Sequence, residues 1–62
     1  MVNIKYSFGD EILFERNETT VPDISDIIYH HGDEYSILEI TNFEDTNGDP
    51  WRSFIELKKH AD

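Results

Sequence analysis

The chain has 62 residues, a net charge of −9 and no cysteine. A domain this short buries only about 60% of the surface that its unfolded chain exposes, and without cysteine it cannot add disulfides or thiolate zinc sites. Apolar residues make up 37% of the chain and aromatic residues 13%, which is too many for a disordered acidic tail. The composition therefore predicts a single folded domain over residues 1–62.

The first third of the chain predicts two strands. Apolar and polar residues alternate over residues 3–8, which is the period of a strand. Gly9 and Asp10 interrupt this alternation. Residues 11–15 then predict a short strand with a buried apolar centre, and the polar residues 16–20 predict a loop.

Residues 23–31 are compatible with two structures. Apolar residues at helical spacing, with Asp23 as an N-cap and Gly32 as a stop signal, favour one or two helical turns. The β-branched residues of the same stretch are equally typical of a strand.

The second half predicts two further strands around a turn. Residues 34–43 are the clearest strand, and their apolar side chains change face between Ile37 and Leu38, which predicts a bulge or burial on both faces. Residues 44–50 contain an Asn-Gly pair suited to positive φ and predict a turn, and residues 54–58 predict the last strand.

Short strands separated by turn signals predict a mostly-β fold, a small barrel or sandwich that contains one short helical turn. The core is expected to be built from the apolar positions of the best strand candidates. These positions are Ile12, Phe14, Tyr35, Ile37, Ile40, Ile55 and Leu57.

Three segments resemble small SH3-like β-barrel proteins, many of which come from bacteriophages and prophages. Residues 8–12 hold a Gly-Asp pair before an apolar residue, residues 32–37 place a tyrosine three positions after a glycine, and residues 51–57 run from an aromatic into a closing strand. The similarity spans residues 6–59. It implies an SH3-like barrel of about five short strands and a role in binding, without a particular ligand.

Most of the negative charge lies between Asp10 and Asp49, where twelve acidic residues accompany one base, Arg16. Such a field repels nucleic acid and anionic membranes and attracts basic protein surfaces. Acidic side chains also keep proteins soluble, and this simpler interpretation stays open. The functional interpretation is that the spaced carboxylates copy the phosphates of nucleic acid and occupy the site of a protein that binds nucleic acid.

The sequence thus predicts a protein-binding module without enzymatic activity, a small phage-type inhibitor that acts as a DNA mimic on a basic surface of a host protein. No signal peptide pattern is visible, so the cytoplasm is the expected compartment, and this is the host cytoplasm if the protein is phage-encoded. The alternative is an adaptor that docks a peptide or polymerase surface through exposed aromatics, with the charge incidental. The predicted contacts are Asp23, Asp26, Asp33, Glu34, Glu44, Asp45, Asp49, Trp51 and Tyr29.

Signals for metals and catalysis are weak. Residues 45–56 place oxygen donors at most positions of an EF-hand loop, but Pro50 stands where that loop needs glycine. The adjacent His30 and His31 point apart in any regular element and lack the spacing of a four-ligand zinc site. No serine lies in a nucleophile motif. The sequence therefore predicts no metal, no cofactor and no direct contact with nucleic acid.

Overall fold

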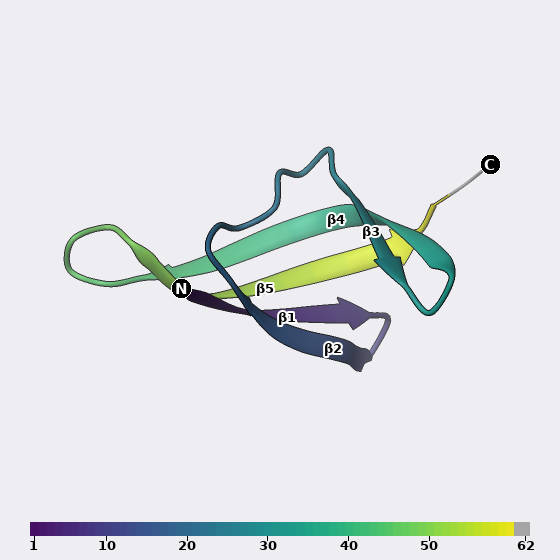
Figure 1. Cartoon of the computed structure of the whole chain (residues 1–62), viewed down its shortest axis with the longest axis horizontal. Helices are drawn as coiled ribbons and strands as arrows, with labels where there is room; N and C mark the ends of the chain where they lie inside the picture. The colour runs from purple at the N-terminus through teal and green to yellow at the C-terminus, as the bar shows by residue number, and fades with distance from the viewer. Residues whose placement is uncertain (61–62) are drawn as a thin grey trace.

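A computed structural model of the chain describes residues 1–60. In this part the chain forms five strands and no helix (Figure 1), and hence no helix long and apolar enough to cross a membrane. The strands build one curled sheet in the order β2-β1-β5-β4-β3. Their bounds are β1 Val2–Phe8, β2 Glu11–Glu18, β3 Ile27–His30, β4 Asp33–Glu44 and β5 Pro50–Lys59. The prediction of a small, mostly-β, barrel-like fold is confirmed at this level.

The sheet joins the first and last strands of the chain. Neighbouring strands are antiparallel except β1 and β5, which pair in parallel over residues 3–8 and 52–57. Two parallel strands cannot be joined by a tight turn. The contact of β1 with β5 therefore forms only when the whole chain between them, including β2, β3 and β4, connects one to the other. The sheet ends at β2 on one side and at β3 on the other, and these two edges curl toward each other.

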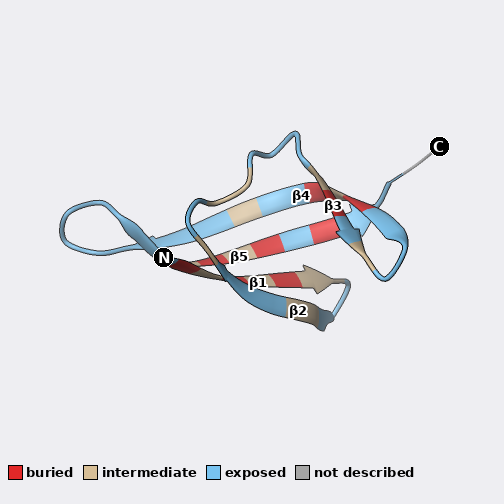
Figure 2. Ribbon diagram, in the orientation of Figure 1, coloured by how far each residue is buried: buried red, intermediate tan, exposed pale blue. Residues whose placement is uncertain are grey.

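The core lies on the inner face of the curled sheet. Buried residues alternate with more exposed ones along β1 and β5 and at the start of β4 (Figure 2). The hydroxyl of the buried polar residue Ser53 donates a hydrogen bond to the side-chain oxygen of Asn42. The buried apolar side chains are Val2, Ile4, Tyr6, Ile28, Tyr35, Ile37, Ile55 and Leu57.

Six of the seven predicted core positions are at least half-buried, and one is not. Tyr35, Ile37, Ile55 and Leu57 are buried, and Phe14 and Ile40 pack against them at the border of the core. The prediction for Ile12 is wrong.

The side chain of Ile12 is 56% exposed because β2 carries a bulge. Tyr6 pairs with Phe14, but the next residue of β1, Ser7, pairs with Ile12, so Leu13 has no partner in β1. Ser7 lies on the outer face, and its partner comes to the outer face with it. The predicted loop at residues 16–20 is also too long, since β2 continues to Glu18.

The segment 23–31 holds a single turn followed by a strand, so the helical interpretation is wrong. The Asp23 carboxylate accepts a hydrogen bond from the Ser25 amide at 2.9 Å, as an N-cap does, but the chain enters strand β3 at Ile27 and no helix follows. His31 and Gly32 have φ values of 49° and 82°. Two consecutive positive φ angles are the backbone of a two-residue hairpin turn. Gly32 therefore joins β3 to β4 instead of ending a helix.

Two other turn and bulge predictions are confirmed. The register of β4 against β5 shifts between Ile37 and Glu39, which leaves Leu38 in a bulge and moves Ile40 to the inner face. Gly48 in the β4–β5 turn has a φ of 84°, as the Asn-Gly pair predicts.

Candidate protein-binding surface

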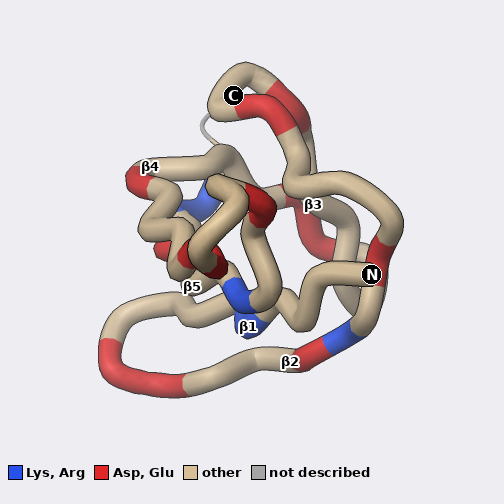
Figure 3. The backbone as a smooth tube through the Cα atoms, turned by 90° about the vertical axis from the view of Figure 1, so that its left-hand side faces the viewer, with Lys and Arg blue, Asp and Glu red and all other residues tan. Residues whose placement is uncertain are grey.

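Acidic side chains cover much of the molecule and are little compensated within it. Every carboxylate in residues 1–60 is exposed except that of Glu18, which is half-buried. In the same residues one ion pair forms, between Lys59 Nζ and Asp33 Oδ1 at 3.2 Å. Figure 3 shows Asp and Glu positions all around the backbone, with few Lys and Arg positions between them. The negative field of the chain therefore reaches the solvent.

The predicted contact residues fall into two groups at opposite ends of the molecule. Strand β4 runs from Asp33 to Glu44 along the long axis of the molecule (Figure 1), and at about 3.3 Å per residue its ends lie at most roughly 36 Å apart. The group around β3, hereafter the β3 end, comprises Asp23, Asp26, Tyr29, Asp33 and Glu34. The group around the β4–β5 turn, hereafter the hairpin end, comprises Glu44, Asp45, Asp49 and Trp51. The predicted contact residues thus do not form one continuous patch.

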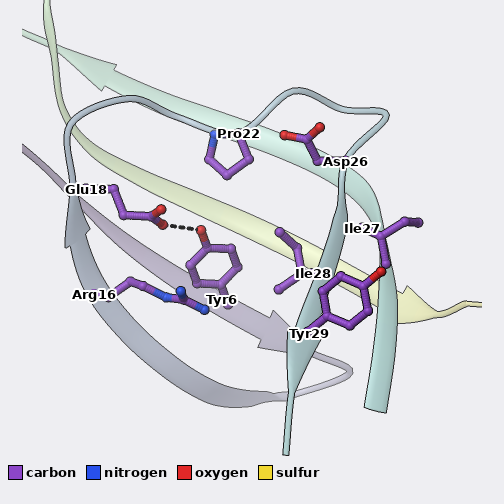
Figure 4. Close-up of a pocket in the computed structure, with 8 residues that line it drawn as sticks. All are labelled: Tyr6, Arg16, Glu18, Pro22, Asp26, Ile27, Ile28 and Tyr29. Atoms are coloured by element: carbon purple, nitrogen blue, oxygen red, sulfur yellow. Dashed lines mark hydrogen bonds between the residues drawn. The ribbon is translucent and has the colours of Figure 1, made fainter. Parts of the chain in front are cut away.

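Two hollows meet at Tyr29 in the β3 end. The first, of about 330 Å³, lies between β2 and β3, and Tyr29 and Asp26 help to line it (Figure 4). The second, of about 410 Å³, is lined by Tyr29 together with Asp33 and Glu34. The Tyr29 side chain is 64% exposed. The β3 end therefore offers an exposed aromatic ring with carboxylates on both sides.

The first hollow combines an apolar base with charged walls. The Tyr6 hydroxyl donates a hydrogen bond to the Glu18 carboxylate at 2.6 Å. Burial of the ring and this bond to a carboxylate raise the pKa of Tyr6 well above its ordinary value, so the hydroxyl keeps its proton and remains a donor. Arg16 lies above the same ring, with its guanidinium carbon 5.5 Å from the ring centroid.

A stack of rings joins the two edges of the sheet. Phe14 on β2 stacks on Tyr6 and also on His30 of β3, with ring centroids 4.4 Å apart in both pairs. No Cα atom of β2 lies within 8 Å of a Cα atom of β3, so the edges are not paired through their backbones. Removal of the ring from water, followed by the charges of His31 and Arg16, lowers the pKa of His30.

The hairpin end carries a partly exposed aromatic cluster. The Phe43 ring lies 6.4 Å from Trp51 and 5.5 Å from Phe54, measured between centroids. Phe43 is 42% and Trp51 is 51% exposed. The Asp45 carboxylate accepts hydrogen bonds from the amides of Asn47 and Asp49 at 2.9 and 3.1 Å. One carboxylate of this end thus holds the turn together.

Some residues of the surface were not selected by sequence analysis. Arg16 and Glu18 reach the first hollow because β2 extends into the predicted loop. Phe43 meets Trp51 because the hairpin pairs Phe43 with Arg52. The Asn-Gly turn was the available signal for Phe43, since a hairpin places its flanking residues opposite one another.

No family model, no curated protein and no solved structure matches the chain. Its function is therefore inferred from its own residues.

Proposed function

We propose that the chain is a protein-binding module that covers the basic, nucleic-acid-binding surface of another protein, in the manner of a DNA mimic. The observation that carries this proposal is the state of the carboxylates. Within residues 1–60 all but one are exposed, and only Asp33 forms an ion pair with a base. Uncompensated charge of one sign accelerates association with a surface of the opposite sign and suppresses other partners.

The outer face of the sheet supports a role for the charge outside folding. Glu39 on β4 lies directly opposite Glu56 on β5. Like charges at directly opposed positions of a sheet destabilise it. Folding does not require this pair of like charges, and the binding of a basic partner would relieve their repulsion.

The resemblance to small SH3-like phage proteins gives the proposal its setting. Three segments carry this resemblance. Residues 8–12 span the turn from β1 to β2, residues 32–37 enter β4 from the β3–β4 turn, and residues 51–57 lie in β5. On this basis the partner is a host protein in the host cytoplasm, and the chain inhibits it without catalysis.

Competition with DNA tests the proposal. The immobilised chain is incubated with a bacterial lysate at low salt, and the captured proteins are then eluted with duplex DNA and identified by mass spectrometry. Elution of a small set of nucleic-acid-binding proteins is the expected result, and poly-glutamate at equal charge should release much less. Captured proteins that DNA does not release would contradict mimicry.

A second candidate function is favoured by the aromatic cluster of the hairpin end. Trp51 and Phe43 are about half exposed in a short projecting hairpin, and Trp is a frequent anchor in protein interfaces. In this adaptor function the aromatics dock on a peptide or polymerase surface. Docking of this kind should depend weakly on salt, whereas charge mimicry should weaken strongly as salt rises.

A further inference from the structure

We propose that the hollow between β2 and β3 binds one arginine side chain of the partner. The proposal rests on the proposed protein-binding function and names the chemical group that this function recognises. The shape of the hollow, its charge and its unused hydrogen-bond acceptors each lead to it.

The shape of the hollow suits a side chain better than a passing strand. Pro22, in the connection between β2 and β3, lines the hollow (Figure 4), and the stack of Phe14 on His30 bridges the same two strands outside its lining. The backbones of β2 and β3 do not pair, and about 330 Å³ is left between them. This volume is at the lower limit of small-molecule pockets, and it is large enough to admit one long side chain.

The net charge of the side chains that line the hollow is complementary to one cation. Two carboxylates, those of Glu18 and Asp26, face one guanidinium, that of Arg16. Figure 4 shows Glu18 and Asp26 on opposite sides of Pro22. One negative charge therefore remains without a partner in the lining.

Both carboxylates keep an oxygen for a ligand. Tyr6 donates to Oε2 of Glu18, and the Asp23 amide donates to Oδ2 of Asp26 at 3.0 Å. Within residues 1–60 no hydrogen bond reaches Oε1 of Glu18 or Oδ1 of Asp26. Acceptors on two walls suit a planar group with several donors, such as guanidinium, better than an ammonium ion.

The apolar lining fits the rest of an arginine side chain. Ile28 and Pro22 offer contact to the methylene groups of the bound side chain. The exposed ring of Tyr29 lies on the other side of β3 from Ile28 (Figure 4) and is not needed for this contact. Arg16 shows that a guanidinium packs on an aromatic ring in this region, with its guanidinium carbon 4.6 Å from the Phe14 ring centroid.

The test is a titration of the whole ¹⁵N-labelled chain with N-acetyl-L-arginine methylamide, followed by NMR. The expected result is saturable shift changes confined to the amides around Glu18, Asp26 and Tyr29. The citrulline analogue, which has nearly the same shape and no charge, should bind at least about tenfold more weakly because the charge-assisted hydrogen bonds are lost.

Two pairs of variants separate this hollow from the general negative field. Asp26→Asn should weaken binding about tenfold, while Glu44→Gln, which removes one charge at the hairpin end, should leave it unchanged. Arg16→Gln should tighten binding, while Lys58→Gln, which makes the same change on the outer face, should not. A two-dimensional spectrum of each variant checks its fold. If Asp26→Asn does not fold, Glu18→Gln takes its place because it neutralises the other carboxylate of the lining.

Three results would overturn the proposal: shift changes that spread over all acidic residues without saturation, equal binding of the citrulline analogue, or equal effects of Asp26→Asn and Glu44→Gln. The protein-binding function is tested separately. If the arginine probe fails while DNA still releases captured proteins, the hollow is not the recognition site and the function stands. If the probe binds as expected and DNA releases nothing, DNA mimicry fails and the hollow remains a cation site.

Discussion

The two ends of the molecule have similar side chains but use them differently. Both carry several carboxylates and an exposed aromatic residue, Tyr29 at the β3 end and Trp51 at the hairpin end. At the β3 end Asp26 lines a hollow whose base belongs to the core, through Tyr6 and Ile28, and Asp33 and Glu34 line a second hollow. At the hairpin end Asp45 and Asp49 lie in a turn that projects beyond the sheet, and Asp45 holds this turn as Asp23 holds the turn before β3.

This difference shows that composition alone does not define a binding site. A group that binds in a hollow is itself partly removed from water, so its attraction to a carboxylate of the lining is stronger there than in open solvent. A carboxylate on a projecting turn is surrounded by water and screened by salt. We therefore expect the β3 end to determine which group is bound, and the hairpin end to add contact area.

The largest expected effect is a difference in stability between substitutions at two positions of β4, one in the core and one near the hairpin end. Ile37→Ala, in the buried part of β4, should cost about 2–5 kcal/mol of the free energy of unfolding, which is most of the stability of so small a domain. Phe43→Ala, near the hairpin end of the same strand, should cost about 1 kcal/mol or less because its ring is partly exposed. Urea unfolding followed by circular dichroism measures both, and equal losses would show that the core extends into the hairpin.

The next effect concerns the dissociation of the captured partner. Tyr29→Ala should increase the dissociation rate about tenfold, since the ring stands between both hollows, and Trp51→Ala should increase it less. Tyr29→Phe is the matched control and should keep most of the affinity. Surface plasmon resonance measures all three variants. A larger effect at Trp51 would favour the adaptor function.

A smaller effect depends on pH. The folded chain lowers the pKa of His30, so the folded state binds a proton less readily than the unfolded state. The contribution of this residue to stability is therefore complete above the ordinary histidine pKa of about 6.5 and is lost as pH falls through the folded pKa. Thermal unfolding between neutral and mildly acidic pH should show this loss in the unmodified chain. His30→Gln should reduce it, and an identical pH dependence in that variant would exclude His30 as its source.

Local patterns in the sequence were sufficient for several parts of the fold. Alternation predicted the buried positions Tyr35, Ile37, Ile55 and Leu57, because burial on one face repeats with the period of a strand. The Asn-Gly pair predicted the β4–β5 turn, because glycine tolerates the positive φ that such a turn requires. The face change after Ile37 predicted the bulge in β4.

Other parts depend on contacts that local patterns do not contain. The bulge that exposes Ile12 is set by pairing with β1, and the parallel contact of β1 with β5 joins residues about fifty positions apart. Gly32 has the same identity in a hairpin turn as after a helix, so its role was decided by the pairing of β3 with β4. For the same reason the division of the predicted contact residues between two ends could not be predicted from their order in the chain.

The measurement that decides most about the proposed function is the association rate of the captured partner across a range of salt concentrations. Two double variants remove the same charge, Asp33→Asn with Glu34→Gln at the β3 end and Glu44→Gln with Asp49→Asn at the hairpin end. We predict that both slow association and flatten its dependence on salt, and that the β3-end variant does so more strongly. Association rates unchanged in both variants would contradict charge mimicry and leave the carboxylates as solubilising charge.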